Sequence, residues 1–182
     1  MDFTLSAKTS EYAAKLQAFM DKEVFPAEAI YEHQRAELKA AGKPHGLPAV
    51  VEELKVKARA QGLWNLFLPH SHDPHHGLTV TEYATLAEIT GWSPEIAPEA
   101  INCAAPDTGN MELLDMFATD EQKKMWLEPL LNGRIRSGFA MTEPDVASSD
   151  ARNIQTSIVK DGGDYVICLL YTSDAADEGL GV

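Results

Sequence analysis

The spacing of apolar residues changes once along the chain, near residue 133. Before that point, apolar residues recur every three or four positions, as in amphipathic helices; Tyr12, Leu16 and Phe19 form the first such set. After it, residues 154–159 partly alternate between polar and apolar, which is typical of a strand. The pattern predicts an α+β chain, with an all-α helical bundle over residues 1–133 and the start of an antiparallel β domain over residues 134–167.

Prolines, glycines and hydroxyl residues predict where the first helices begin and end. Thr9 or Ser10 is expected to cap the first helix. Pro26 is expected to open a second helix, because proline is tolerated in a first helical turn. A third helix should run from Pro48 to a stop at Gly62.

Two capping boxes mark later helices. Residues 79–82 (Thr-Val-Thr-Glu) and 119–122 (Thr-Asp-Glu-Gln) each place a hydroxyl residue three positions before Glu or Gln. Between them we expect an apolar helix that contains Ile101 and Cys103 and is broken by residues 105–110.

The β part should contain a hairpin. Residues 135–141 can form a buried strand, and residues 161–164 (Asp-Gly-Gly-Asp) are a hairpin-type turn that leads into a partner strand at residues 165–167. Two or three strands are rarely stable alone, so the β domain looks cut short.

Between these strands lies a loop, residues 139–150, that is rich in small hydroxyl side chains. Pro144 favours an extended Glu143, so the chain should leave a strand here without starting a helix. Thr142, Ser148 and Ser149 could donate hydrogen bonds to an acceptor-rich ligand such as a phosphate. On composition alone a plain turn, in which Asp145, Ser148 and Ser149 are only turn formers, is the preferred interpretation.

Composition narrows the class of protein. The chain has 182 residues, 45% hydrophobic and 24% charged, which is typical of a globular protein. A net charge of −13 argues against nucleic-acid binding, which requires a basic face. Cys103 and Cys168 form no disulfide framework, no apolar run reaches membrane-spanning length, and no signal peptide is visible, so we expect a cytoplasmic protein. Histidines 70, 72, 75 and 76 are neighbours around a proline and are not expected to bind a metal.

Four segments together resemble one known family. Residues 139–150 (Phe-Ala-Met-Thr-Glu-Pro-Asp-Val-Ala-Ser-Ser-Asp) resemble the flavin-binding loop of the acyl-CoA dehydrogenases. Residues 62–69, 105–112 and 121–131 are similar to the same family, in the same order, and most similar to its long-chain branch of members ten and eleven. Several ordered segments are more specific than one short motif.

The resemblance implies a function. Family members carry FAD and perform the α,β-dehydrogenation of fatty acyl-CoA thioesters in fatty acid β-oxidation. A glutamate removes the α proton, hydride passes to the flavin, and the electrons leave to an electron-transfer flavoprotein. The full-length enzymes are homo-oligomers. Their catalytic base belongs to a C-terminal domain that this sequence lacks, so we expect no catalytic residue here and an inactive fragment.

The resemblance also implies site residues. Phe139, Met141 and Thr142 should lie along the flavin, and Ser148 should contact the cofactor pyrophosphate. Ser148 or Ser149 should reach the acyl-CoA; the loop is one residue longer than the common form, which leaves these two open. Glu143 is expected to be a structural carboxylate.

The last residues, 168–182, match nothing in the family, and we interpret them as an artefact at the end of a truncated gene. Two other functions stay open at this point. One is a non-catalytic helical module that binds acyl-CoA or a partner, and the other is an acyl-CoA oxidase of the same fold.

Overall fold

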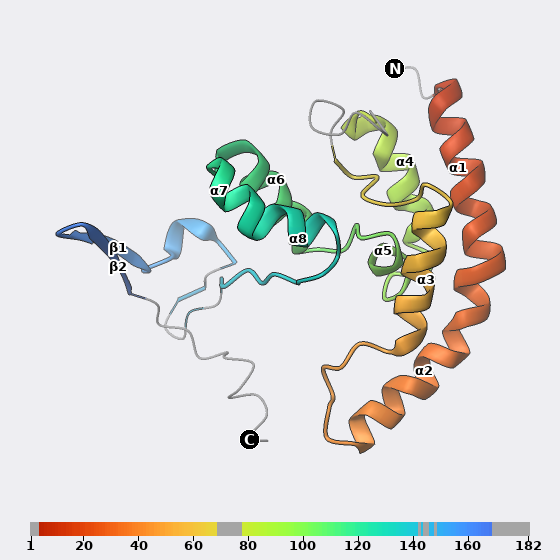
Figure 1. The fold of residues 1–182 in the computed structure, drawn as a ribbon, viewed down its shortest axis with the longest axis horizontal. Coiled ribbons are helices and arrows are strands. Elements are labelled where there is room, and N and C mark those ends of the chain that lie inside the picture. The colour runs from red at the N-terminus through yellow and green to blue at the C-terminus, as the bar shows by residue number, and fades with distance from the viewer. Residues whose placement is uncertain (1–3, 69–77, 142, 144–145, 148, 169–182) are drawn as a thin grey trace. The chain divides into compact units, whose positions relative to one another are not determined.

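The computed structural model describes residues 4–68, 78–141, 143, 146–147 and 149–168. The chain divides into two compact units, residues 1–137 and residues 138–182, and each is described by itself. The first unit is helical and the second carries a pair of strands (Figure 1). A helical region followed by antiparallel strands confirms the predicted α+β class. The loop of neighbouring histidines, Thr142, Ser148 and the tail from residue 169 lie outside the described residues.

The chain begins with two helices that join without a break. Helix α1 (Ala7–Phe19) passes through a π-helical turn (Met20–Val24) into α2 (Phe25–Ala40) (Figure 1). Pro26 lies in the first turn of α2, as predicted. Proline has no N–H and its ring clashes with the carbonyl four residues earlier, and the wider π turn before it accommodates both defects.

The same arrangement recurs near the end of the helical unit. Helix α7 (Asp120–Gln122) passes through a second π-helical turn (Lys123–Leu127) into α8 (Glu128–Leu131), which has Pro129 in its first turn. Proline inside a helix commonly kinks or shortens it. The structure instead widens the turn that precedes it.

The N-termini of α1 and α4 (Val80–Thr90) share a cap. The capping box at residues 79–82 is confirmed, with both reciprocal hydrogen bonds present. Ser6, and not Thr9 or Ser10, caps α1: its Oγ accepts from the Thr9 N–H at 3.0 Å, while its hydroxyl donates to Glu82 Oε1 at 2.7 Å. The backbone donor of Thr79 and the Ser6 hydroxyl lower the pKa of the Glu82 carboxyl to about 2.

The remaining helices partly match the prediction. Helix α3 (Ala49–Ala60) follows Pro48 and is closed at Gly62, whose φ of +70° favours glycine. The capping box at residues 119–122 is confirmed. The apolar helix α5 is short (Ala97–Ala100) and excludes both residues predicted in it, because Ile101 is its C-cap and Cys103 lies beyond. Residues 107–110 do not break a helix but begin α6 (Asp107–Phe117), since the break lies just before them.

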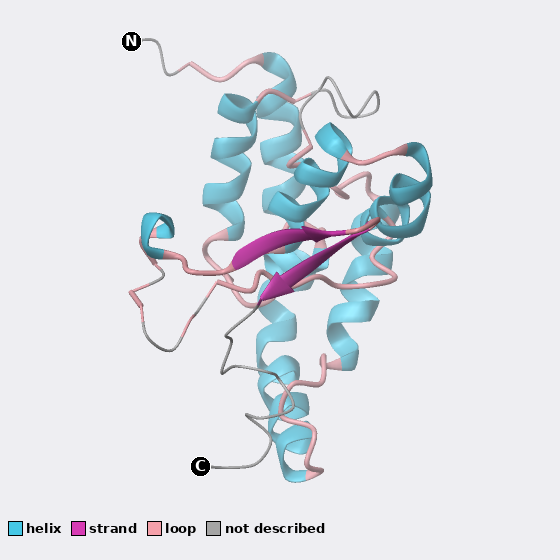
Figure 2. Ribbon diagram, turned by 90° about the vertical axis from the view of Figure 1, so that its left-hand side faces the viewer, coloured by secondary structure: helices cyan, strands magenta, loops and turns pink. Residues whose placement is uncertain are grey.

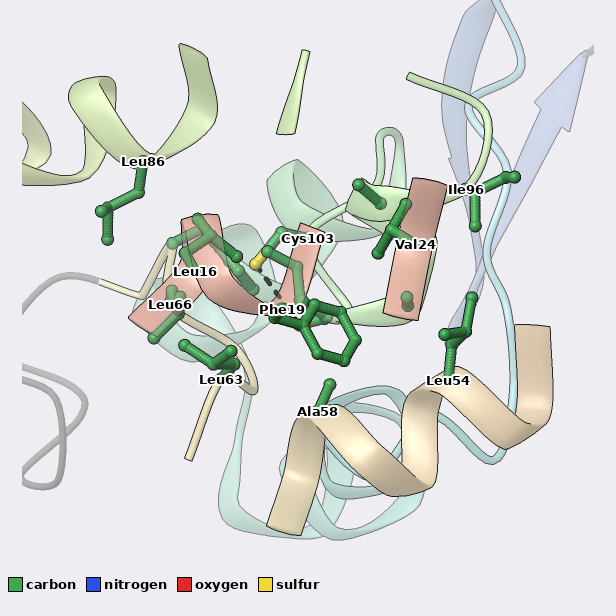
Figure 3. Close-up of a cluster of buried hydrophobic side chains, with 14 of the residues drawn as sticks. Leu16, Phe19, Val24, Leu54, Ala58, Leu63, Leu66, Leu86, Ile96 and Cys103 are labelled. Carbon is green, nitrogen blue, oxygen red and sulfur yellow. Dashed lines mark hydrogen bonds between the residues drawn. The ribbon is translucent and has the colours of Figure 1, made fainter. Parts of the chain in front are cut away.

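One core unites the helical unit. Phe19 is 1% exposed and lies among side chains from α3, α4 and the segment that follows α3, with its ring toward Ala58 (Figure 3). The segment after α3 also contributes to this core, since its Leu63, Leu66 and Phe67 are buried. Helices α1 and α4, and α3 and α5, pack as pairs around this core.

The second unit contains a hairpin. Strand β1 (Ser157–Asp161) pairs antiparallel with β2 (Asp164–Cys168), and the pairing of Asp161 with Asp164 leaves a two-residue Gly-Gly turn, as predicted (Figure 2). Gly162 has φ of +59°, as such turns require. The described part of residues 135–141 is not a strand, contrary to the prediction, because a strand needs a pairing partner and the described sheet has two strands.

We expect the central Phe19 side chain to contribute strongly to the free energy of unfolding. Phe19→Ala should lower the free energy of unfolding by about 3–5 kcal/mol, because it leaves a cavity in the core. Phe25 lies six residues later in the same continuous helix and is 36% exposed; Phe25→Ala is the matched control and should cost less than about 1 kcal/mol. Urea denaturation measures both, and equal losses would contradict this view of the core.

Candidate functional site

Three of the predicted site residues lie within the described part of the flavin-loop segment, residues 139–150. Phe139 is 67% exposed, Met141 is half-buried and Ser149 is exposed. Thr142 and Ser148 lie outside the described residues, so their predicted roles stay predictions. An exposed aromatic side chain and an accessible hydroxyl in one loop are group types suited to a planar ring and its polar substituents.

Glu143 is held within this loop by several hydrogen bonds. Its carboxylate is buried and accepts hydrogen bonds from the Gln155 N–H at 2.9 Å, the Thr156 N–H at 2.9 Å and the Thr156 hydroxyl at 2.6 Å. The Thr156 hydroxyl, followed by these backbone donors, lowers the pKa of the Glu143 carboxyl. The carboxylate therefore ties the loop to the residues that lead into β1, which agrees with its predicted structural role.

Asp150 holds the end of the loop. Its side chain accepts from the Arg152 N–H at 3.1 Å and caps a short 3₁₀ turn, Ala151–Asn153. The Arg152 side chain, which lies 2.6 Å from Asp150 Oδ2, lowers the pKa of this carboxyl. Both acidic side chains described in the loop thus have structural partners, and neither is suited to act as a general base.

A second candidate site is a cavity in the helical unit. It has a volume of about 290 Å³ and is lined by side chains from the segment after α3, from α4 and from the start of α6. These residues are Phe67, Val80, Tyr83, Cys103, Ala105, Thr108, Gly109 and Glu112. The lining is mainly apolar with a few polar groups, as in sites for apolar ligands.

The two ionisable groups deepest in this cavity stay neutral. Burial raises the pKa of the Cys103 thiol to about 11 and also raises the pKa of the Tyr83 phenol. Cys103 is therefore neither a nucleophile nor a ligand in its resting form. Sequence reasoning missed this cavity because each lining residue fits an ordinary core position, and the segments that meet here are distant in the chain.

Two negative findings concern the described residues alone. In this part of the chain, no three His, Cys, Asp or Glu side chains gather closely enough to hold a metal ion. None of the helices in the same residues is long and apolar enough to cross a membrane.

Comparison with known proteins assigns the family. The family described as "Acyl-CoA dehydrogenase, N-terminal domain" matches residues 6–134, which is more than half of the chain. Together with a helical unit that leads into a hairpin through the flavin-loop segment, this match shows the class. The chain belongs to the acyl-CoA dehydrogenase family.

Individual members of this family are similar to most of this chain. FadE2 of Mycobacterium tuberculosis, named for an acyl-CoA dehydrogenase, is 59% identical over 180 residues, which cover 97% of this chain and 42% of that protein. Acyl-CoA dehydrogenase family member 11 of mouse is 47% identical over 91% of this chain and 20% of its own length. The predicted similarity to members ten and eleven is confirmed, since member 10 of mouse is 49% identical.

A solved structure agrees with the fold. A Mycobacterium abscessus protein named for the same family superposes with a TM-score of 0.81 at 48% identity, covering 91% of this chain and 41% of that one. The chain thus spans about two fifths of the length of the mycobacterial relatives. The FadE2 match reaches into the tail after Ile167, although no comparison tests where that tail originates.

The titration of Glu143 should be visible in amide exchange. A carboxyl whose pKa is lowered on folding stabilises the fold above its unfolded pKa, and this contribution is lost as pH falls through the folded pKa. We expect the protection factors of the Gln155 and Thr156 amides to be constant above about pH 5 and to fall below pH 4.

Glu143→Gln is the matched control, because glutamine keeps an acceptor oxygen but does not titrate. In this variant the two amides should be less protected, with no dependence on pH between 3 and 7. Hydrogen exchange followed by NMR measures both forms. Equal protection of these two amides in the wild type and in Glu143→Gln near neutral pH would contradict the structural role of the carboxylate.

Proposed function

We propose that this chain forms the N-terminal helical part and one side of the flavin site of an FAD-dependent acyl-CoA dehydrogenase. The proposed reaction is α,β-dehydrogenation of fatty acyl-CoA thioesters. The single observation that carries the proposal is family membership over residues 6–134, directly followed by a loop with the predicted site residues. Transfer of electrons to an electron-transfer flavoprotein, assembly as a homo-oligomer, a role in β-oxidation and a cytoplasmic location belong to the same proposal.

The described loop residues fit a flavin. Phe139 presents an exposed aromatic face, Met141 is half-buried beside it in the sequence, and the Ser149 hydroxyl is accessible. In our proposal Phe139 and Met141 lie along the ring system, and Ser149 donates to a phosphate or to the acyl-CoA. When bound, FAD supplies the acceptor for the hydride from the β carbon of the thioester.

In this proposal the residues of the chain contribute by positioning the ligands. Glu143 and Asp150 are both held by hydrogen bonds, which fix the loop at these two positions. A preorganised site avoids the entropic cost of ordering a loop when ligand binds. Neither carboxylate removes the α proton in this proposal, and the base is expected elsewhere in the full-length enzyme.

We assign the cavity near Tyr83 to the acyl chain. Its volume of about 290 Å³ suits a section of an aliphatic chain and is too small for a whole coenzyme A thioester. The neutral thiol and phenol in its wall suit an apolar ligand, while the lining also contains the side chain of Glu112 at one place.

The test is to express the complete gene and record the flavin spectrum. The purified protein should be yellow, and anaerobic addition of a fatty acyl-CoA should bleach the flavin band. A colourless protein that is indifferent to acyl-CoA would contradict the proposal and favour a non-catalytic module. Release of peroxide in air, at a rate that matches turnover, would instead assign an acyl-CoA oxidase.

Loss of the Phe139 ring should weaken flavin binding. Phe139→Ala in the full-length protein should reduce FAD affinity by about 0.5–1.5 kcal/mol, the usual contribution of a stacked aromatic pair. Phe25→Ala is the control, because Phe25 is partly exposed but belongs to the helical unit. Titration of apoprotein with FAD measures both, and equal affinities in the two variants would refute the assigned role.

Filling the cavity should reduce acyl-CoA affinity without harming the fold. A Cβ added at Gly109 meets no heavy atom within 4 Å, and Gly109 lies inside α6, where glycine is a poor helix former. Gly109→Leu should therefore keep or raise the melting temperature while increasing the KM for long acyl chains more than for short ones. Gly109→Ala is the graded control with a smaller effect. An unchanged chain-length profile would place the acyl chain elsewhere.

A further inference from the structure

A second cavity of the helical unit has no part in the proposed function. It has a volume of about 320 Å³ and lies between α2 and residues 92–96, in the segment that joins α4 to α5. Helix α2 contributes Glu28, Tyr31 and Glu32, which share a face because they are three and four residues apart. One wall of the cavity is therefore acidic and aromatic.

The opposite wall exposes a large aromatic ring. Trp92 lines the cavity and is 77% exposed, more than any other large apolar side chain in the described residues. The core of the unit thus makes little use of this ring. The electron-rich face of an indole attracts organic cations more strongly than the rings of tyrosine and phenylalanine do.

Ser93, in the same wall, has a buried hydroxyl without a partner. The residue is 4% exposed, and the described part of the chain shows no hydrogen bond of its side chain. Only its backbone is engaged: the Ser93 carbonyl accepts from the N–H groups of residues 96 and 97 at 3.2 and 2.8 Å. Buried hydroxyls normally have a partner, because an unpaired one is unfavourable. A polar ligand in the cavity would supply the missing partner.

The carboxylates around the cavity are only partly neutralised. Arg35 pairs with Glu95 at 2.6 Å and lies 5.7 Å from the centre of the Tyr31 ring. Glu28 and Glu32 form no ion pair in the described residues, so the cavity keeps an excess of negative charge. The chain's own cation is thus held here by a carboxylate and an aromatic ring, the same two types of group that the rest of the cavity offers.

We propose that this cavity binds a small aliphatic amine in its ammonium form. The ammonium N–H groups donate to the Ser93 hydroxyl and to the carboxylates of Glu28 and Glu32, and the aliphatic stem lies along the indole ring of Trp92. A quaternary ammonium is less suitable, because it has no N–H for the Ser93 hydroxyl. The volume of about 320 Å³ is at the lower end for small-molecule sites, which limits the ligand to a short stem.

This inference goes beyond the proposed function and does not rest on it, because every residue that carries it belongs to the helical unit. The test uses the full-length protein labelled with 5-fluorotryptophan. Fluorine NMR follows the Trp92 signal, identified by its loss in Trp92→Leu, while n-butylamine is added near neutral pH, where the amine is protonated.

Butylamine should shift the Trp92 signal with a dissociation constant of about 1 mM, which is within the limit for a ligand of this size. n-Butanol and butyrate are the matched probes, because they keep the stem but carry no positive charge, and neither should shift the signal at that concentration. No shift with butylamine, or an equal shift with butanol, would overturn the proposal.

Ser93→Ala is the sharpest variant, since it removes only the unpaired hydroxyl. It should weaken butylamine binding by about 3- to 10-fold, the usual effect of one hydrogen bond, and leave the melting temperature unchanged or higher. Ser10→Ala, at an exposed serine of the same unit, is the control and should match wild type. A lower melting temperature with unchanged affinity for butylamine would overturn the proposal, because it would show a purely structural hydroxyl.

The acidic wall is tested by calorimetric titration with the same amine. The double variant Glu28→Gln, Glu32→Gln should weaken binding by about 10-fold or more, because contacts to charged groups are the stronger ones. Glu37→Gln, on the same helix but outside the cavity, is the control and should match wild type. Equal affinities in the two proteins would refute the role of the acidic wall.

Two further outcomes separate the alternatives. A lysine-containing peptide that binds when butylamine does not would assign the cavity to a basic partner protein and overturn the small amine. Binding of butylamine to a full-length protein that holds no flavin would support the amine site while the proposed function fails, so the two proposals fail separately.

Discussion

Asp107 is the constraint around which the last third of the helical unit is arranged. Its carboxylate is buried in the first turn of α6, and a buried carboxylate is unfavourable unless it is paired and hydrogen-bonded. The partners come from Arg136 and Ser137, about thirty residues later. The chain must therefore return to α6 after α8, and this return determines where the helical unit ends. Packing alone would leave that end less defined, because residues 134–137 add little apolar surface to the core.

Proline shapes the helices of this unit in a consistent way. At Pro26 and at Pro129 a π-helical turn comes directly before the helical turn that holds the proline. In the first case the result is one uninterrupted rod from α1 through α2, which presents Phe19 to the core on one side of the turn. In the second case the turn ends in α8, whose last carbonyls are satisfied by side chains from distant segments. Local backbone geometry thus accommodates each proline, and long-range polar contacts satisfy the end of α8.

The sequence predicted what depends on neighbouring residues. Both capping boxes and the Gly-Gly hairpin turn were confirmed, because each is decided within four residues. The predicted cap of α1 was wrong. Thr9 is buried, and the Ser6 hydroxyl accepts the hydrogen bond from the Thr9 N–H. The pairing of Arg136 with Asp107 and the cavity beside Tyr83 could not be predicted, since they join positions tens of residues apart. The site residues proposed in the loop rest on family resemblance, not on their local pattern.

The described residues of the candidate site are suited to position ligands, and none of them is suited to remove a proton. Catalysis of α-proton removal requires a base with a free lone pair and a pKa near the working pH. In the loop, Glu143 is surrounded by three donors and Asp150 pairs with Arg152, and both pKa values are lowered. In the cavity, burial keeps the Cys103 thiol protonated. Each of these groups therefore keeps one protonation state. This property is expected of residues that hold a cofactor and an acyl chain in place. The proposed reaction requires two tasks, the positioning of ligands and the removal of the α proton. The described residues are suited to the first.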